Sequence, residues 1–145
     1  MLNWSRGHLG VVATEAGSDW VIPFVDSINQ SGGGSKAVLV PLYQLVYHDA
    51  VVISYGARDQ KSLLQGLLFG GVPEMPVAQG GTEEKTLALM RQMAALHARV
   101  GLLEMTKHEF LDKNYRKERT TFADGTTVTV DWDANTYNVS PELTK

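Results

Sequence analysis

One group of residues near the amino terminus has the composition of an acid–base site. Glu15 is followed by Asp19 and Trp20 in the segment TEAGSDW. It comes directly after an apolar run at 7–14, which has the pattern of a buried strand. Enzymes built on parallel strands place acid–base carboxylates just past the carboxyl ends of those strands. Trp20 would add an aromatic surface on which a sugar ring can stack. The alternative is a solvated turn in which Asp19 caps a helix.

A second group, Tyr47, His48 and Asp49, interrupts the apolar segment 37–53. Polar groups in such a segment must find partners, since an unpaired polar group destabilises a core. One interpretation is a strand end that opens on a polar pocket. The other is a His–Asp pair that locks two loops together. Both remain open from the sequence.

A third group, Glu104, His108 and Glu109, looks at first like a metal or acid–base set. The zinc motif HExxH is absent, because Phe-Leu-Asp-Lys follows His108-Glu109. Glu104 and His108 are four residues apart and are expected to pair on a helix face. We therefore predict no metal site, and the absence of GxGxxG and Walker loops predicts no cofactor.

The elements that would position these groups can be read from the residue pattern. Residues 37–53 are expected to hold two buried strands, and 19–28 are ambiguous because Pro23 disfavours a helix interior. Residues 59–69 predict a helix capped by Asp59. A longer helix is predicted from Thr82, with an apolar stripe along it and its end at Gly101. Alternating Thr and Val around Asp124-Gly125 predict a hairpin, with a further strand at 137–139.

Composition narrows the classes of function. The chain has 145 residues, no cysteine and a formal net charge of −3. It is long enough for one domain with a real core. No basic stripe favours nucleic acid, and no apolar run is long enough to cross a membrane. No signal peptide is recognised, so the location stays unknown, with the cytoplasm as the default.

Five phrases, taken in order, resemble the C-terminal part of a group of bacterial glycoside hydrolases. They are VVATEAGSDWVIPFVD, VPLYQLVYHDAVV, LLQGLLFGGVPEMP, LHARVGLLEMTKHEFL and RKERTTFADGTTVTV. The group is similar to the endo-α-N-acetylgalactosaminidase type, in which β-structure follows a β/α barrel. The resemblance implies an α/β fold: a single domain, 1–145, with a partial β/α barrel over 1–112. A C-terminal antiparallel hairpin or meander would follow over 113–145.

The resemblance also implies roles for individual residues. Glu15 matches the general acid/base, and Asp19 and Trp20 would line the sugar pocket. Tyr47, His48 and Asp49 would lie at the mouth of a later strand. The nucleophile of the related enzymes would precede residue 1, so the first half of the barrel is expected to be absent here. Asp49 or Asp19 would then have to replace it.

Three interpretations follow. The chain is a minimal glycosidase acting on a carbohydrate substrate, an inactive remnant that binds carbohydrate, or a structural module with no role in sugar chemistry. We favour the first, because Glu15, Asp19, Trp20, His48 and Asp49 are all present. A partial barrel leaves two sheet edges open. A homo-oligomer, by default a dimer, is therefore expected. A monomer whose C-terminal hairpin covers the edge is the alternative.

Overall fold

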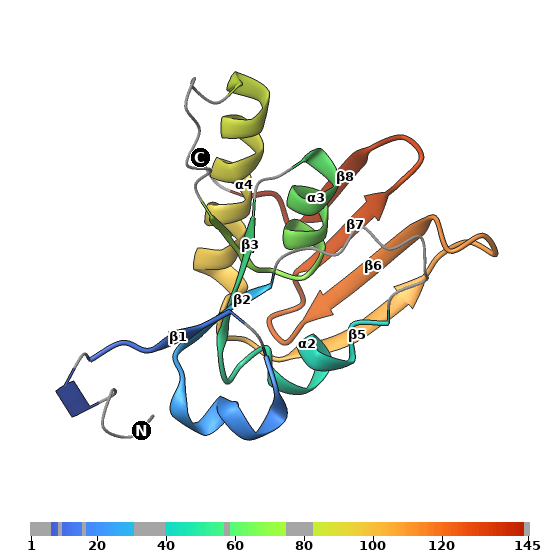
Figure 1. The fold of residues 1–145 in the computed structure, drawn as a ribbon. Coiled ribbons are helices and arrows are strands. Elements are labelled where there is room, and N and C mark those ends of the chain that lie inside the picture. Colours follow the sequence, from blue (N-terminus) through green and yellow to red (C-terminus); the bar gives the residue numbers. More distant parts are fainter. Residues whose placement is uncertain are drawn as a thin grey trace.

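The computed structural model describes residues 7–8, 10–15, 17–30, 40–56, 59–74 and 83–143. They form an α/β structure with two four-stranded sheets, one parallel and one antiparallel (Figure 1). Helices separate the two sheets. The expected α/β class is confirmed at this level.

The parallel sheet is built from strands β1 (Ala13–Thr14), β2 (Ser27–Gln30), β3 (Val52–Gly56) and β4 (Val72–Glu74). They lie side by side in chain order. The expected strand at 7–14 is reduced to its last two residues. The second apolar stretch of 37–53 does form a strand, β3. All four carboxyl ends therefore meet at one edge of the sheet.

Three helical segments connect these strands: η1 (Asp19–Phe24), α2 (Leu42–Tyr47) and α3 (Gln60–Leu68). A further helix, α4 (Glu84–Val100), follows β4 and leads to the antiparallel sheet. The Asp59 cap of α3 is confirmed, because its carboxylate accepts a hydrogen bond of 2.7 Å from the backbone N–H of Ser62. The ambiguous segment after Trp20 is a short 3₁₀ helix that contains Pro23. The predicted Thr82 cap lies outside the described residues, and α4 is described from Glu84.

The prediction of a strand in the first part of 37–53 is wrong. Residues 37–39 lie outside the described residues, and 42–47 form helix α2. The buried positions on this turn of helix are polar: Gln44 and His48 are each 4% exposed. Leu42 and Val46 are instead 67% and 61% exposed. Polar residues occupy the buried positions of this helix, so the spacing of its apolar residues does not indicate a helix.

The apolar stripe of α4 is confirmed. Met90, Met93, Leu96 and Val100 are all buried, at the spacing of one helix face. Gly101 follows as the C-cap, as predicted. Met93 packs against α3 at Gly66, where a side chain would collide with the methionine.

The antiparallel sheet is a meander of β5 (Met105–Phe110), β6 (Lys117–Phe122), β7 (Thr127–Asp131) and β8 (Thr136–Ser140). The hairpin around Asp124-Gly125 is confirmed, with Gly125 at φ 83°. The helix expected around Glu104 and His108 is wrong, because this segment is β5 and pairs with β6. The antiparallel sheet thus includes residues before 112.

Helix α3 lies between the two sheets (Figure 1). Leu63, Leu64, Leu67 and Leu68 are almost completely buried. On one side α3 contacts β3, and on the other it contacts β6 and β7. The Thr120 hydroxyl of β6 donates to the backbone carbonyl of Leu68, which satisfies a carbonyl at the helix end. The two sheets therefore share one core.

Candidate functional site at the carboxyl edge of the parallel sheet

Glu15 lies one residue past β1, at the carboxyl edge of the parallel sheet. Thr14 pairs with Ile28 of β2, so Glu15 is level with the next residue of β2. Its side chain is exposed. Asp19 and Trp20 begin η1 on the same connection, and Trp20 is 70% exposed. The structure therefore keeps these three predicted residues on one connection that leaves the carboxyl end of a strand.

Tyr43 of α2 packs against this connection. A Cβ at Gly17 would lie 3.0 Å from the Tyr43 hydroxyl oxygen. Burial raises the pKa of Tyr43, and the negative charge of Asp19 raises it further. The Tyr43 phenol is therefore neutral at physiological pH, beside the segment that carries Glu15 and Asp19.

Three polar residues, Asn29, Ser54 and Glu74, lie at the same edge of the sheet and form what we call the polar row. Asn29 of β2 pairs with Ser54 of β3, and Ser54 is level with Val72 of β4. The Ser54 hydroxyl donates a hydrogen bond of 2.6 Å to the carboxylate of Glu74, the last residue of β4. These polar side chains are all half-buried.

The row lies on the face of the sheet that points away from α3. Ile53 and Tyr55 flank Ser54 in sequence and are buried, and the Tyr55 ring contacts Phe69 at the end of α3. Because side chains alternate along a strand, Ser54 points to the opposite face. Glu74 shares that face, since it bonds to Ser54.

Tyr47, His48 and Asp49 are not at a strand mouth, which corrects their expected position. Tyr47 ends α2, and His48 and Asp49 form the turn that precedes β3. Glu15 follows the carboxyl end of β1, whereas Asp49 precedes the amino end of the parallel strand β3. The structure therefore does not bring Asp49 to the edge that carries Glu15.

His48 joins the two halves of the core. Its Nδ1 lies 2.6 Å from the carbonyl oxygen of Leu103, and its Nε2 lies 2.9 Å from that of Phe69. Burial lowers the pKa of His48, although both carbonyls favour the charged ring. A neutral ring has a single N–H, so it donates to one of these carbonyls at a time. The sequence left open a His–Asp pair that locks two loops together. His48 does hold two segments together, but its partners are backbone carbonyls.

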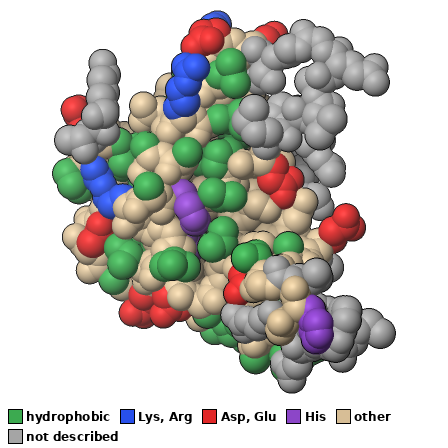
Figure 2. Space-filling model, turned by 90° about the vertical axis from the view of Figure 1, so that its left-hand side faces the viewer, with side chains coloured by type: hydrophobic (Ala, Val, Ile, Leu, Met, Phe, Trp, Pro, Cys, Tyr) green, Lys and Arg blue, Asp and Glu red, His purple; other side chains and the backbone are tan. Residues whose placement is uncertain are grey.

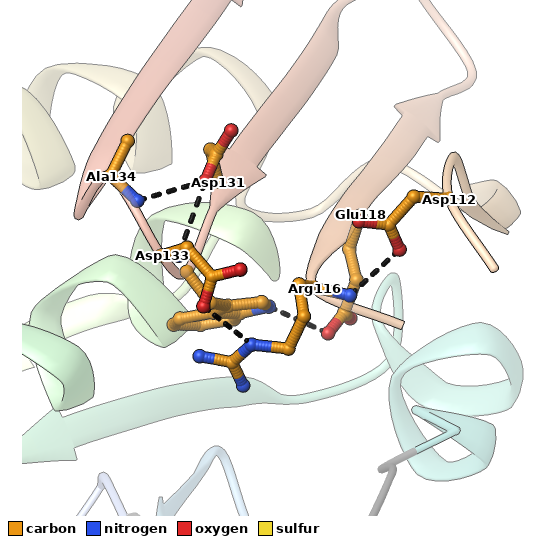
Figure 3. Close-up of polar contacts among 7 residues, drawn as sticks. Asp112, Arg116, Glu118, Asp131, Asp133 and Ala134 are labelled. Carbon is orange, nitrogen blue, oxygen red and sulfur yellow. Dashed lines mark hydrogen bonds and ion pairs between the residues drawn. The ribbon is translucent and has the colours of Figure 1, made fainter. Parts of the chain in front are cut away.

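The third sequence group is also dispersed. His108 points into the core from β5, and its Nε2 lies 3.3 Å from a carboxylate oxygen of Glu118 on β6. Glu118 also accepts a hydrogen bond of 2.6 Å from the Trp132 indole N–H. Figure 3 shows this carboxylate of Glu118 together with Arg116, whose guanidinium contacts Asp133. Glu109 pairs with Lys107 at the surface.

Metal and membrane sites find no support in the part of the chain that the structure describes. There, no three His, Asp or Glu side chains gather as a metal would require. Across the same ranges, no helix has both the length and the apolar character needed to cross a membrane. On the face drawn in Figure 2, hydrophobic side chains occupy much of the centre, and acidic side chains are scattered around them. The described basic side chains form no continuous stripe on that face.

Sequence reasoning missed Ser54 and Glu74. Gly70, Gly71 and Pro73 indicate the end of a helix, and a strand of only three residues beside them has no pattern of its own. A signal was present: VPE has an apolar residue followed, two positions later, by an acid, directly before a new connection. In a parallel sheet, this is the place of a functional carboxylate.

Comparison with solved structures shows that the fold is similar to that of a glycoside hydrolase. The similar structures are of α-N-acetylgalactosaminidase NagBb from Bifidobacterium bifidum. A quadruple mutant has a TM-score of 0.83 and 28% identity, over 97% of this chain and 25% of that chain. The complex with GalNAc has a TM-score of 0.79 and 30% identity, over 96% of this chain and 25% of that one. The complex with Gal-NHAc-DNJ has a TM-score of 0.81, 29% identity and 96% coverage of this chain.

These likenesses confirm the resemblance to a bacterial glycoside hydrolase. The chain spans about a quarter of the length of the enzyme it matches. No protein-family model matches the sequence, and no curated protein matches it either.

Proposed function

We propose that this chain is a partial β/α barrel of a glycosidase, with its site at the carboxyl edge of the parallel sheet. The observation that carries the proposal is the position of Glu15. It is a carboxylate directly past the end of β1, on a sheet similar to that of an α-N-acetylgalactosaminidase. The substrate would be a glycoside of α-linked N-acetylgalactosamine.

In this proposal, Glu15 is the general acid/base. Its carboxyl proton would pass to the glycosidic oxygen as the bond to the sugar breaks, and its carboxylate would then take a proton from water. Trp20 would present its exposed ring to the substrate. Asp19 lies on the same connection and is the nearest described carboxylate along the chain. Tyr47, His48 and Asp49 have no part in this proposal, because they are at the amino side of β3.

The second carboxylate decides between catalysis and binding. Hydrolysis requires two carboxyl groups about 5–5.5 Å apart for retention or about 6.5–9.5 Å apart for inversion. The strands that lead to Glu15 and Glu74 are three steps of about 4.8 Å apart, a backbone spacing of roughly 14 Å. Asp19 lies on the same connection as Glu15, and it is the candidate for the second carboxylate.

A non-catalytic carbohydrate-binding module is the second candidate function. The observation that favours it is the position of Asp49, which leaves one fewer carboxylate at the edge with Glu15. Binding needs only the polar row and an aromatic surface. Hydrolysis also needs the paired carboxylates.

The test is a screen against nitrophenyl glycosides of both anomers, with N-acetylgalactosaminides first. The Glu15→Gln variant is the paired sample, and Glu104→Gln, an exposed acid after α4, is the matched control. Release that disappears only in Glu15→Gln supports the glycosidase. No release, with calorimetric binding of N-acetylgalactosamine, supports the binding module.

We also propose a homo-oligomer, by default a dimer. In the sheet order, β1 and β4 are the outer strands, each with one neighbour among the described strands. Unpaired edges promote association between chains. Light scattering during size-exclusion chromatography distinguishes a dimer from a monomer.

A further inference from the structure

The contact between Ser54 and Glu74 fixes a carboxylate at the end of β4. The Ser54 hydroxyl donates to Oε1 of Glu74 at 2.6 Å, and the same hydroxyl lies 3.4 Å from the Ile28 carbonyl oxygen. The two residues come from neighbouring strands whose register is set by the pair Gly56–Glu74. The carboxylate is therefore held by the sheet itself, and its orientation does not depend on a long connection.

This carboxylate has acceptor capacity left for a ligand. An ionised carboxylate offers about four lone-pair positions, and Ser54 takes one of them. Glu74 is half-buried, so a hydrogen bond made to it is less weakened by water than one at a fully exposed site. Asn29, level with Ser54 on the same face, adds an amide that both donates and accepts.

Glu74 lies on the strand farthest from Glu15 in the parallel sheet. Strands β2 and β3 separate β1 from β4, a backbone spacing of roughly 14 Å across the sheet. The two carboxylates nevertheless lie at one edge of one sheet. A ligand that reaches from Glu15 toward Glu74 would meet a group suited to recognition.

We propose that Glu74, oriented by Ser54, accepts hydrogen bonds from the hydroxyl groups of the sugar bound at this edge. This inference rests on the proposed carbohydrate site, and it assigns a specificity-determining residue within it. Ser54 is a positioning residue, since it acts through Glu74. The ligand class is a pyranose with free hydroxyl groups, and N-acetylgalactosamine is the probe.

The first test is kinetic. Glu74→Gln keeps the shape of the side chain and removes its charge, so we expect KM for the nitrophenyl glycoside to rise about 10–100-fold. The value of kcat changes by less than about 3-fold, because the group binds ground state and transition state alike. Glu109→Gln, a surface acid on β5, is the matched control. An unchanged KM in Glu74→Gln overturns the inference and leaves the proposed function intact.

The positioning role of Ser54 has its own readout. Ser54→Ala is expected to raise KM about 10-fold, and Ser54→Thr, which keeps a hydroxyl on the strand, restores the original value. The double variant Ser54→Ala/Glu74→Gln is expected to be no worse than Glu74→Gln alone, because both changes remove one unit. If the two substitutions raise KM independently, so that their factors multiply in the double variant, the positioning role of Ser54 is contradicted.

Binding separates this inference from catalysis. Chemical-shift titration of the full chain with free N-acetylgalactosamine needs no hydrolysis. Weaker binding by Glu74→Gln, with unchanged binding by the control Glu109→Gln, supports the inference even where the unaltered chain releases no nitrophenol. Equal binding by the unaltered chain and Glu74→Gln overturns it, and so does an absence of binding by the unaltered chain. Circular dichroism of every variant shows that the fold is kept.

Discussion

Gly70 leaves the space in which the imidazole of His48 lies: a Cβ at Gly70 would be 2.9 Å from Nε2 of His48. The same Cβ would lie 2.9 Å from side-chain atoms of Phe122 and of Val100. Gly70 also has φ 63°, which a side chain disfavours. One glycine therefore allows α3, α4, the antiparallel sheet and the His48 turn to meet.

Gly70→Ala is expected to lower the free energy of unfolding by about 2–5 kcal/mol, the sum of backbone strain and overpacking. Gly125→Ala is the matched control. Gly125 has φ 83°, but a Cβ there meets nothing within 4 Å. It is expected to cost only about 1–2 kcal/mol. Urea denaturation measures both values, and equal losses would show that the packing around His48 does not need the space at Gly70.

The lowered pKa of His48 predicts a pH dependence of stability. The unfolded ring binds a proton near pH 6.5, whereas burial makes the folded ring bind it only at lower pH. The contribution is therefore fully present above about pH 6.5 and is lost as the pH falls toward the folded pKa. We expect the unaltered chain to lose more stability between pH 7.5 and 5.5 than His48→Gln, as measured by urea denaturation. Parallel curves would assign the acid sensitivity to other groups.

The Asp59 cap predicts a second, separate effect. Hydrogen bonds from Ser62 lower the pKa of the Asp59 carboxyl. Its stabilisation is thus present above the unfolded value near 3.8 and is lost as the pH falls through the folded pKa. Asp59→Ala is expected to cost about 0.5–2 kcal/mol at pH 7, and Asp59→Ser to cost less, because serine also caps helices. The difference in stability between Asp59→Ala and the unaltered chain, measured by thermal unfolding, should be smaller at pH 2.5 than at pH 7. An equal difference at both pH values would refute the cap.

These residues also show what the sequence could and could not predict. The Asp59 helix, the stripe of α4 and the Asp124-Gly125 hairpin follow local rules of capping, periodicity and turn chemistry, and all three are confirmed. Helix α2 was missed because its buried face is Gln44 and His48, which find partners only in the tertiary structure. The four-residue spacing of Glu104 and His108 suits either a helix or a strand, so it does not predict strand β5.

The candidate site was predicted in part for a similar reason. Glu15 was placed correctly at a strand end, since the apolar run before it is local information. Asp49 would lie at the carboxyl end of a strand if the residues before it formed one. They form helix α2, so Asp49 instead precedes the amino end of β3. Ser54 and Glu74 are 20 residues apart and become neighbours only through the register of β3 and β4.

The most direct measurement of the central claim is the hydrolysis rate of Glu15→Gln on two N-acetylgalactosaminides that differ only in leaving group. A general acid is needed most where the leaving group is poor. We predict a fall of about 10²–10⁴-fold for a simple alkyl glycoside and a clearly smaller fall for a dinitrophenyl glycoside, with the fold intact. An equal loss on both substrates, or an unchanged rate, would contradict the assignment of Glu15 as the acid/base at this edge.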